Sequence, residues 1–224
     1  MNIILPDISV IICSYNHEKF IERCIRSLFN QKNFDLKKFE IIIINDCSTD
    51  NTKKILKNYE DINNLHIIHN KKNIGLPKSI NKGIKLAKGR YIVRVDSDDY
   101  VHRDLLFMSK SFLDLNRMYQ AVSVDYVIVN ENEEFIKRAN SLKEEIACGV
   151  MFRKECLFEI GLYNADFPIR EGHELKQRFI KKYKMGYLEF PLYKYRTHNN
   201  NRTKIFKRKI EKIDKKLNKN IDLS

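Results

Sequence analysis

Residues 91–99 read Tyr91-Ile92-Val93-Arg94-Val95-Asp96-Ser97-Asp98-Asp99, so an apolar run leads directly into an acidic cluster. The run predicts a strand that is buried on both faces of a sheet. The cluster places three carboxylates within four residues, and carboxylates packed this closely repel one another unless a cation neutralises them. Mg²⁺ and Mn²⁺ favour oxygen ligands of this kind. The stretch therefore predicts a metal site at a strand end, with a solvated turn or a helix cap as the alternative.

The chain on either side of this stretch alternates apolar, strand-like runs with helical patterns, which is typical of a parallel sheet covered by helices. Predicted strands occupy residues 8–12, 41–44, 65–69, 91–95, 122–129 and 146–152. Predicted helices occupy residues 20–29, 50–59, 77–88, 105–115, 171–182 and 205–217. The predicted fold class is α/β, with a Rossmann-like, mostly parallel sheet flanked by helices. We expect one domain over residues 1–203 and a basic C-terminal helix in the tail 204–224.

The composition limits the class of protein. Its 43% of hydrophobic residues can fill a sizeable core, and no apolar run approaches the roughly 18 residues of a membrane span. The N-terminus lacks the basic region and the cleavage site of a signal peptide, and the five cysteines form no CxxC pair. These features predict reduced thiols and a cytoplasmic location.

The net charge of +13 is the obvious argument for a nucleic-acid partner, but its distribution argues against one. Residues 204–219 hold eight Lys or Arg and two acidic residues, a surplus of six and nearly half of the total. Apolar residues recur there at helical spacing, namely Ile205, Phe206, Ile210, Ile213 and Leu217. This basic amphipathic pattern predicts docking at an anionic membrane surface, at the inner face of the membrane. A helix packed on the body and a disordered tail are the alternatives.

Two further loops follow predicted strands. Asp46 follows the strand at 41–44 and can accept a hydrogen bond from a nucleotide base, or cap the next helix. Ser14 and Tyr15 follow the first strand, and Tyr15 offers an aromatic face to a base or ribose, or packs as an ordinary loop residue. Ligands bind beyond the carboxyl ends of strands in open α/β sheets, so these loops should converge on residues 96–99. The sequence contains no GxGxxG and no P-loop segment, which disfavours dehydrogenases and P-loop proteins.

Six segments occur in an order and at a spacing that resemble the family 2 glycosyltransferases of the GT-A fold. They are residues 10–16, 44–50, 73–76, 81–84, 87–92 and 96–99, and the similarity extends over roughly residues 7–203. The resemblance implies a nucleotide-sugar-dependent, inverting glycosyltransferase. In such an enzyme Asp46 would bind the uracil or another base, and Ser14 with Tyr15 would line the nucleoside pocket.

The resemblance also implies a divalent metal, Mn²⁺ or Mg²⁺. Asp98 would be its principal ligand, Asp96 would lie near the ribose and the metal, and His198, in segment 193–198, would complete the metal or diphosphate site. The metal would offset charge on the departing nucleoside diphosphate, while a carboxylate removes the proton of the acceptor hydroxyl. The transition state should resemble an oxocarbenium ion.

The segment that should supply this catalytic base departs from the family pattern. The family commonly has a Glu-Asp pair here, whereas this chain reads Arg170-Glu171-Gly172-His173-Glu174 and has Gly172 where the Asp would fall. We expect Glu171 to be the base, because Gly172 allows backbone conformations that could bring its carboxylate into the vacated place. Glu174 and His173 are the alternatives, and a charged helix start without a catalytic role is another.

The predicted function is transfer of a sugar from a nucleotide donor, UDP-linked in our expectation, to a saccharide or lipid-linked acceptor in the synthesis of a cell-surface polysaccharide or glycoconjugate. A catalytically silent, sugar-nucleotide-binding subunit is the alternative, and Gly172 is the reason for it. A sugar-phosphate nucleotidylyltransferase is less favoured, because residues 14–20 lack its glycine-rich basic loop. The sequence names neither the sugar nor the acceptor.

Overall fold

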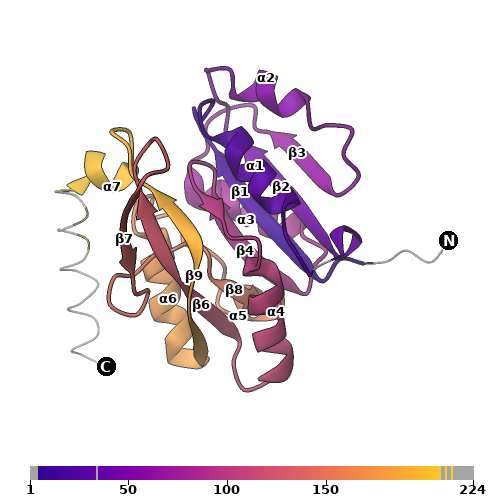
Figure 1. Cartoon of the computed structure of the whole chain (residues 1–224), viewed down its shortest axis with the longest axis vertical. Helices are drawn as coiled ribbons and strands as arrows, with labels where there is room; N and C mark the ends of the chain where they lie inside the picture. Colours follow the sequence, from indigo (N-terminus) through magenta and orange to yellow (C-terminus); the bar gives the residue numbers. More distant parts are fainter. Residues whose placement is uncertain (1–4, 34, 208–209, 211–212, 214–224) are drawn as a thin grey trace.

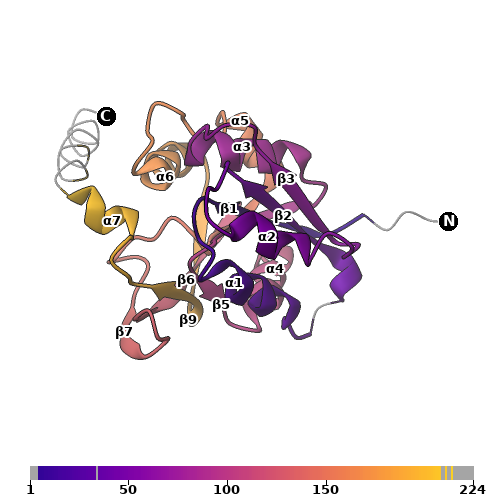
Figure 2. The same cartoon turned by 90° about the horizontal axis from the view of Figure 1, so that it is seen from above.

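The computed structural model describes residues 5–33, 35–207, 210 and 213 of the chain. Within these residues, nine strands form a single mixed sheet in the order β3-β2-β1-β4-β8-β6-β9-β5, with β7 paired to β6 at the side of this row. Helices lie on both faces of the sheet (Figures 1 and 2). The predicted α/β class is confirmed.

The first half of the sheet is parallel, as predicted. β1 pairs with both β2 and β4, and β2 pairs with β3. The strands are β1 (Ile8–Ser14), β2 (Phe39–Asn45), β3 (Leu65–His69) and β4 (Tyr91–Asp96). The connecting helices are α1 (Ile21–Phe29), η1 (Leu36–Lys38), α2 (Thr52–Lys57) and α3 (Leu76–Leu86). All seven residues of β2 are buried, which explains why its sequence is a nearly continuous apolar run.

The second half of the sheet is mixed, and less of it was predicted. β8 runs antiparallel to β4, and β6 runs antiparallel to β8 but parallel to β9. The strands are β5 (Tyr100–Val101), β6 (Ala121–Val129), β7 (Phe135–Ala139), β8 (Met151–Arg153) and β9 (Met185–Arg196). The helices are α4 (Leu105–Leu115), α5 (Lys154–Glu159), α6 (Glu171–Lys182) and α7 (Arg202–Ile205). The strand expected over residues 146–152 is wrong for 146–150, because only the segment from Met151 pairs with β4.

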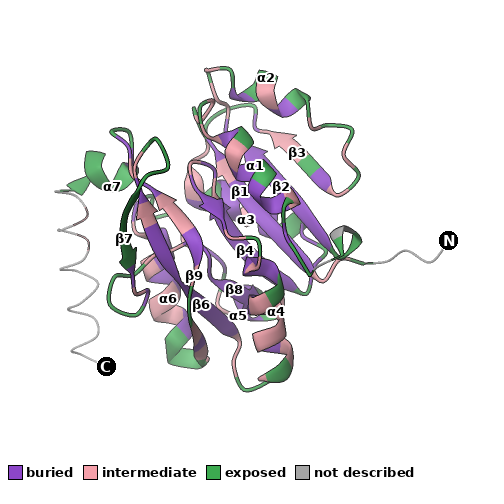
Figure 3. Cartoon of the chain, viewed as in Figure 1, coloured by how far each residue is buried: buried purple, intermediate pink, exposed green. Residues whose placement is uncertain are grey.

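The central strands of the sheet are largely buried (Figure 3), and two hydrophobic clusters lie against them. Neighbouring residues of one strand point to opposite clusters, as Val10 and Ile11 of β1 do. One cluster includes residues of α1, α2 and α4, and the other includes residues of α3, α5 and α6. Burial of each large aliphatic side chain contributes roughly 1.5–3 kcal/mol. The strands are therefore held firmly from both sides, which fixes the loops at their carboxyl ends.

Most of the predicted tail lies outside the described residues. α7 ends at Ile205, and only residues 210 and 213 are described beyond 207. The helix expected over 205–217 and the separation of a tail at residue 204 therefore stay predictions. Among the helices that the structure describes, none is long and apolar enough to cross a membrane.

Candidate functional site

A cavity of about 690 Å³ lies at the carboxyl edge of the sheet, a size typical of small-molecule sites. Its lining comes from the ends of β1, β2 and β4, the start of α6, and β9 with the segment that follows it. Six of the predicted site residues line it, namely Ser14, Tyr15, Asp46, Asp96, Asp98 and Glu171. His198 lies behind Asp98 and contacts it. Glu174 is not among the lining residues.

The loop after β1 is tied to the loop after β2. The backbone N–H of Asn16 donates to Ser48 Oγ at 3.0 Å, and Asn16 Oδ1 accepts from the Thr49 N–H at 2.8 Å. Tyr15 is exposed, with 46% of its surface accessible. Ser14 is buried, and its Oγ has no hydrogen-bond partner among the described residues. Buried hydroxyls are nearly always paired, and Ser14 lines the cavity, so the unpaired Oγ is a feature that a bound water or ligand would explain.

Asp46 fastens the loop that precedes α3. Its Oδ1 accepts from Asn70 Nδ2 at 2.8 Å and from the Ile74 N–H at 2.9 Å, and its Oδ2 accepts from the Gly75 N–H at 2.9 Å. A carboxylate offers about four lone-pair positions, so about one is left for a ligand in the cavity. Asp46 does not cap α2, because the N-cap of that helix is Asn51.

The three carboxylates of the acidic cluster point to three different partners. Asp96 binds Arg94, Asp98 contacts His198, and Asp99 accepts from Tyr193 Oη and from the Arg196 N–H, both at 2.7 Å. Burial, together with the neighbouring charges of Asp98 and Asp96, raises the pKa of Asp99 well above its ordinary value. Asp99 therefore joins the end of β4 to β9, while Asp96 and Asp98 face the cavity.

Asp98 and His198 meet although they are far apart in the sequence. Asp98 Oδ2 lies 3.0 Å from His198 Nε2, and the imidazole is almost fully buried. Burial would raise the pKa of Asp98, but the hydrogen bond from His198 and the charges of His17 and His198 outweigh it and lower the pKa. His17, which the sequence did not single out, lies edge-on to His198 with ring centroids 6.3 Å apart. Its position directly after the loop 14–16 was the available signal.

The donor atoms of this corner fit the metal that the resemblance implies. Carboxylate oxygens such as those of Asp96 and Asp98 are ligands that Mn²⁺ and Mg²⁺ accept. Cys148 is also close, since its ligand atom and those of Asp96 and Asp99 lie within 4.8 Å of one another. Burial raises the pKa of Cys148 well above its ordinary value, and Mg²⁺ and Mn²⁺ prefer oxygen ligands to thiolates. Asp96 and Asp98 therefore offer carboxylate oxygens to the cavity, while His198 Nε2 is held by Asp98 and does not line it.

Arg94, also missed in the sequence, lies between two of the predicted site residues. Its Nε and Nη2 donate to Asp96 at 2.7 and 3.1 Å, and its Nη1 donates to Glu171 Oε1 at 2.8 Å. Arg94 and Glu171 are both more than 90% buried. Burial would lower the pKa of Arg94, but the charges of Asp96 and Glu171 outweigh it and hold it well above its ordinary value. One guanidinium thus joins the end of β4 to the start of α6.

The start of α6 separates the two candidate bases. Glu171 faces the cavity, whereas Glu174 binds Arg178 at 2.5 and 2.7 Å. Gly172 is helical, so the conformational freedom that we expected from it is not used; the left-handed residue is Arg170, with φ 66°. A Cβ on Gly172 would lie 2.3 Å from Ala147 Cβ. Close packing therefore explains the glycine, and an Asp at this position has no room.

The third candidate base, His173, also lines the cavity. Its Nε2 lies 2.8 Å from Arg170 Nη1 and 3.5 Å from Glu145 Oε2. The ring is therefore held at the rim by two charged partners from different segments. Glu171, by contrast, is joined through Arg94 to Asp96, one of the residues predicted to bind the sugar-nucleotide donor.

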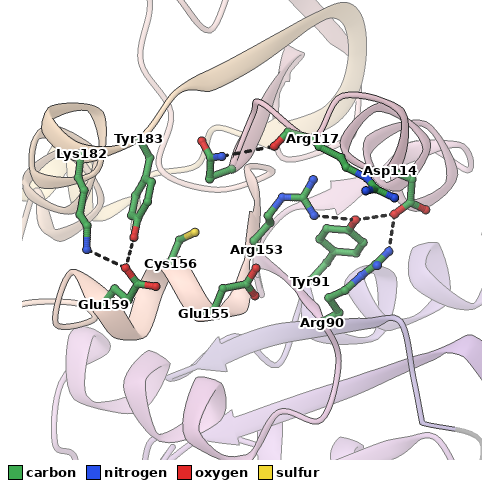
Figure 4. A pocket seen from close by; sticks show the side chains of 11 residues that line it. Arg90, Tyr91, Asp114, Arg117, Arg153, Glu155, Cys156, Glu159, Lys182 and Tyr183 are labelled. Carbon is green, nitrogen blue, oxygen red and sulfur yellow. Dashed lines mark hydrogen bonds and ion pairs between the residues drawn. The ribbon is translucent and has the colours of Figure 1, made fainter.

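A second cavity, of about 770 Å³, lies at the opposite edge of the sheet, where β4 begins with Tyr91. Its charged side chains bind one another. Asp114 accepts from Arg90 and, at 2.5 Å, from Tyr91 Oη, and Glu159 accepts from Tyr183 (Figure 4). No predicted site residue lines this cavity. The cavity at the carboxyl edge is therefore the candidate site.

Comparison with known proteins agrees with this fold. A family profile described as "Glycosyl transferase family 2" matches residues 9–166. The poly(ribitol-phosphate) beta-N-acetylglucosaminyltransferase TarS of Staphylococcus aureus is 38% identical over 107 residues, which are 47% of this chain and 18% of TarS. Less than a fifth of that relative is therefore matched.

Two solved structures share the fold. S. aureus TarS 1–349 in complex with UDP-GlcNAc has a TM-score of 0.74 at 23% identity, over 87% of this chain and 60% of that chain. The mannosyltransferase PcManGT from Pyrobaculum calidifontis, in complex with GDP-Man and Mn²⁺, has a TM-score of 0.69 at 17% identity, over 88% and 59%. At these identities the likeness concerns the arrangement of the chain, which is that of the GT-A fold.

Proposed function

This chain belongs to glycosyl transferase family 2, and we propose that it transfers a sugar from a UDP-linked donor to a saccharide or lipid-linked acceptor, with inversion at the anomeric carbon. The observation that supports the proposal is that six of the predicted site residues line one cavity. In this proposal Ser14 and Asp46 bind the nucleoside, Asp96 and Asp98 the diphosphate with its cation, and Glu171 the acceptor hydroxyl.

The residues divide the chemistry between them. Asp98, with Asp96 and His198, would hold a divalent cation, which offsets negative charge on the departing nucleoside diphosphate. Glu171 accepts the proton of the attacking hydroxyl. In-line attack makes a covalent intermediate with the enzyme unnecessary, so no side-chain nucleophile is needed. The oxocarbenium character of the transition state favours the anionic surroundings that these carboxylates provide.

The uridine nucleotide is proposed from two supports. Asp46 has about one acceptor position left for a base N–H, and the relative TarS was solved with UDP-GlcNAc. The test is a thermal-shift screen of UDP-GlcNAc, other UDP-sugars and GDP-mannose, each with and without Mn²⁺, followed by an assay for release of the nucleoside diphosphate. Stabilisation by UDP-sugars with release of UDP is the expected result. Failure of every nucleotide sugar to bind would overturn the proposal.

Asp46→Ala should weaken UDP binding through loss of a charge-assisted hydrogen bond worth roughly 1.5–3 kcal/mol, or about 10- to 150-fold in Kd. Calorimetry with UDP and Mn²⁺ measures the effect. Asn70→Ala is the matched control, because it removes a partner of Asp46 without altering a residue that lines the cavity. Equal losses of affinity in the two variants would mean that Asp46 acts only by fastening the loop.

One observation favours a second function, a silent sugar-nucleotide-binding subunit. Gly172 stands where the family commonly has an Asp, and the contact with Ala147 leaves no room for a side chain there. This alternative predicts donor binding without either hydrolysis or transfer. Donor turnover by the purified protein at a rate that depends on Glu171 would exclude it.

The basic tail is the proposed means of reaching a membrane-bound acceptor at the inner face of the membrane. Its pattern over 204–219 supports this proposal, and Phe206 and Ile210 also line the cavity mouth. Removal of residues 208–224 should reduce co-sedimentation with phosphatidylglycerol vesicles at least several-fold, because each basic residue near the surface contributes about 1 kcal/mol. Neutral phosphatidylcholine vesicles are the control, and unchanged binding to the anionic vesicles would contradict the proposal.

A further inference from the structure

We propose that Arg94 is a positioning residue of the transfer reaction, which holds the Glu171 carboxylate at a fixed place relative to the donor end of the cavity. The inference rests on the proposed function, because it assigns a role to Arg94 through Glu171. It concerns a residue of β4 whose side chain binds two carboxylates of the site at once.

The geometry gives the guanidinium two separate tasks. One edge, Nε with Nη2, binds both oxygens of Asp96, which ends β4; the remaining Nη1 binds Oε1 of Glu171, which begins α6. A planar guanidinium fixes these directions relative to one another. Asp96 and Glu171, which lie 75 positions apart in the sequence, are therefore kept at a constant separation by one rigid group.

The same contact leaves one oxygen of Glu171 free to accept a proton. Oε1 is occupied by Arg94, and no hydrogen bond to Oε2 is recorded among the described residues, while Glu171 faces the cavity. The terminal torsion of a glutamate is broad, so a carboxylate without this anchor would sample many orientations. A general base has to lie within hydrogen-bond distance of the hydroxyl that it deprotonates. Arg94 thus selects the productive orientation.

Charge alone does not explain the choice of residue. A lysine would supply the same positive charge to this buried pair of carboxylates, but it is a point charge on a flexible stem. It cannot bind Asp96 through two parallel hydrogen bonds and reach Glu171 with a third. Arg94→Lys therefore separates the effect of neutralising the site from the effect of orienting Glu171.

The experiment compares Arg94→Lys, Glu171→Gln and the double variant with the parent, using UDP release from the UDP-sugar that the screen identifies. We expect Arg94→Lys to lower kcat by about 10- to 100-fold, which is smaller than the loss expected when the general base itself is removed. The donor KM should change less than about threefold. Because Arg94 acts through Glu171, the double variant should be no slower than Glu171→Gln alone.

The control is Arg138→Lys, which removes an arginine fork from another buried carboxylate, Asp125, away from the cavity. It should leave kcat unchanged. Losses that multiply in the double variant would overturn the inference, as would a change confined to donor KM. A parent protein that binds and cleaves no UDP-sugar would instead overturn the proposed function. If Arg94→Lys fails to fold, the double variant Arg94→Gln/Glu171→Gln is compared with Glu171→Gln instead, because it removes both charges of the Arg94–Glu171 pair.

Discussion

Glu171→Gln is expected to lower turnover by about 10²–10⁴-fold, the usual contribution of a general base, while donor affinity changes little. The amide is nearly the same size as the carboxylate and can still accept a hydrogen bond from Arg94, but it cannot take up the acceptor proton. Transfer kinetics, with donor binding measured separately by calorimetry, would test this. Because Glu171 contacts Arg94 and not the predicted nucleoside residues, the loss should fall on kcat.

Glu174→Gln is the matched control for that result. Glu174 lies one helical turn further along α6, is buried to a similar extent, and is bound by Arg178. Its replacement should lower stability more than turnover, since it leaves Arg178 without a charged partner. A large loss of turnover for Glu174→Gln together with a normal Glu171→Gln would move the role to Glu174. Normal turnover in both would place the base outside this segment.

Asp98→Asn is expected to abolish the Mn²⁺-dependent part of the stabilisation that UDP gives. In the parent, ligand at about 100 times its Kd adds about 2.7 kcal/mol to the free energy of unfolding. In the variant the amide is a weaker, neutral ligand, so adding Mn²⁺ should produce no further shift in Tm. Thermal unfolding with UDP alone, Mn²⁺ alone and both together would measure the effect.

The control for this prediction is Asp104→Asn. Asp104 follows the acidic cluster in the sequence and precedes α4, but it does not line the cavity. This variant should keep the full response to Mn²⁺ with UDP. A normal metal response in Asp98→Asn would contradict the assignment of Asp98 as the principal ligand and would favour the other carboxylates of the cluster.

The parallel half of the fold could be predicted from the sequence because β1, β2 and β4 are buried on both faces, so that their sequences are nearly continuous apolar runs. β9 escaped prediction for the opposite reason. It mixes exposed and buried residues, contains Pro191, and shifts its register against β6 near Asp125. β7 exposes four of its five residues. Strands of this kind form because they pair with neighbouring strands, and the local sequence pattern does not show which segments pair.

Some residues of the candidate site could likewise be predicted from the sequence, and others could not. Asp46, Asp96 and Asp98 could be singled out because polar residues at the ends of buried strands must meet at one edge of a parallel sheet. Arg94 could not, because a charge inside an apolar run makes sense only once Glu171, 77 residues later, is brought against it. The sequence also could not show why residue 172 is a glycine, because the cause is its close contact with Ala147 and not its backbone conformation.

The contact between Asp98 and His198 has a consequence for the order in which the protein is completed during translation. The two residues are 100 positions apart, and at about 5–20 residues per second the second emerges from the ribosome roughly 5 to 20 seconds after the first. In that interval β1 to β4 can assemble, but Asp98 still lacks the imidazole of His198. The full set of residues proposed to hold the nucleotide and its cation is therefore present only after His198 has joined Asp98.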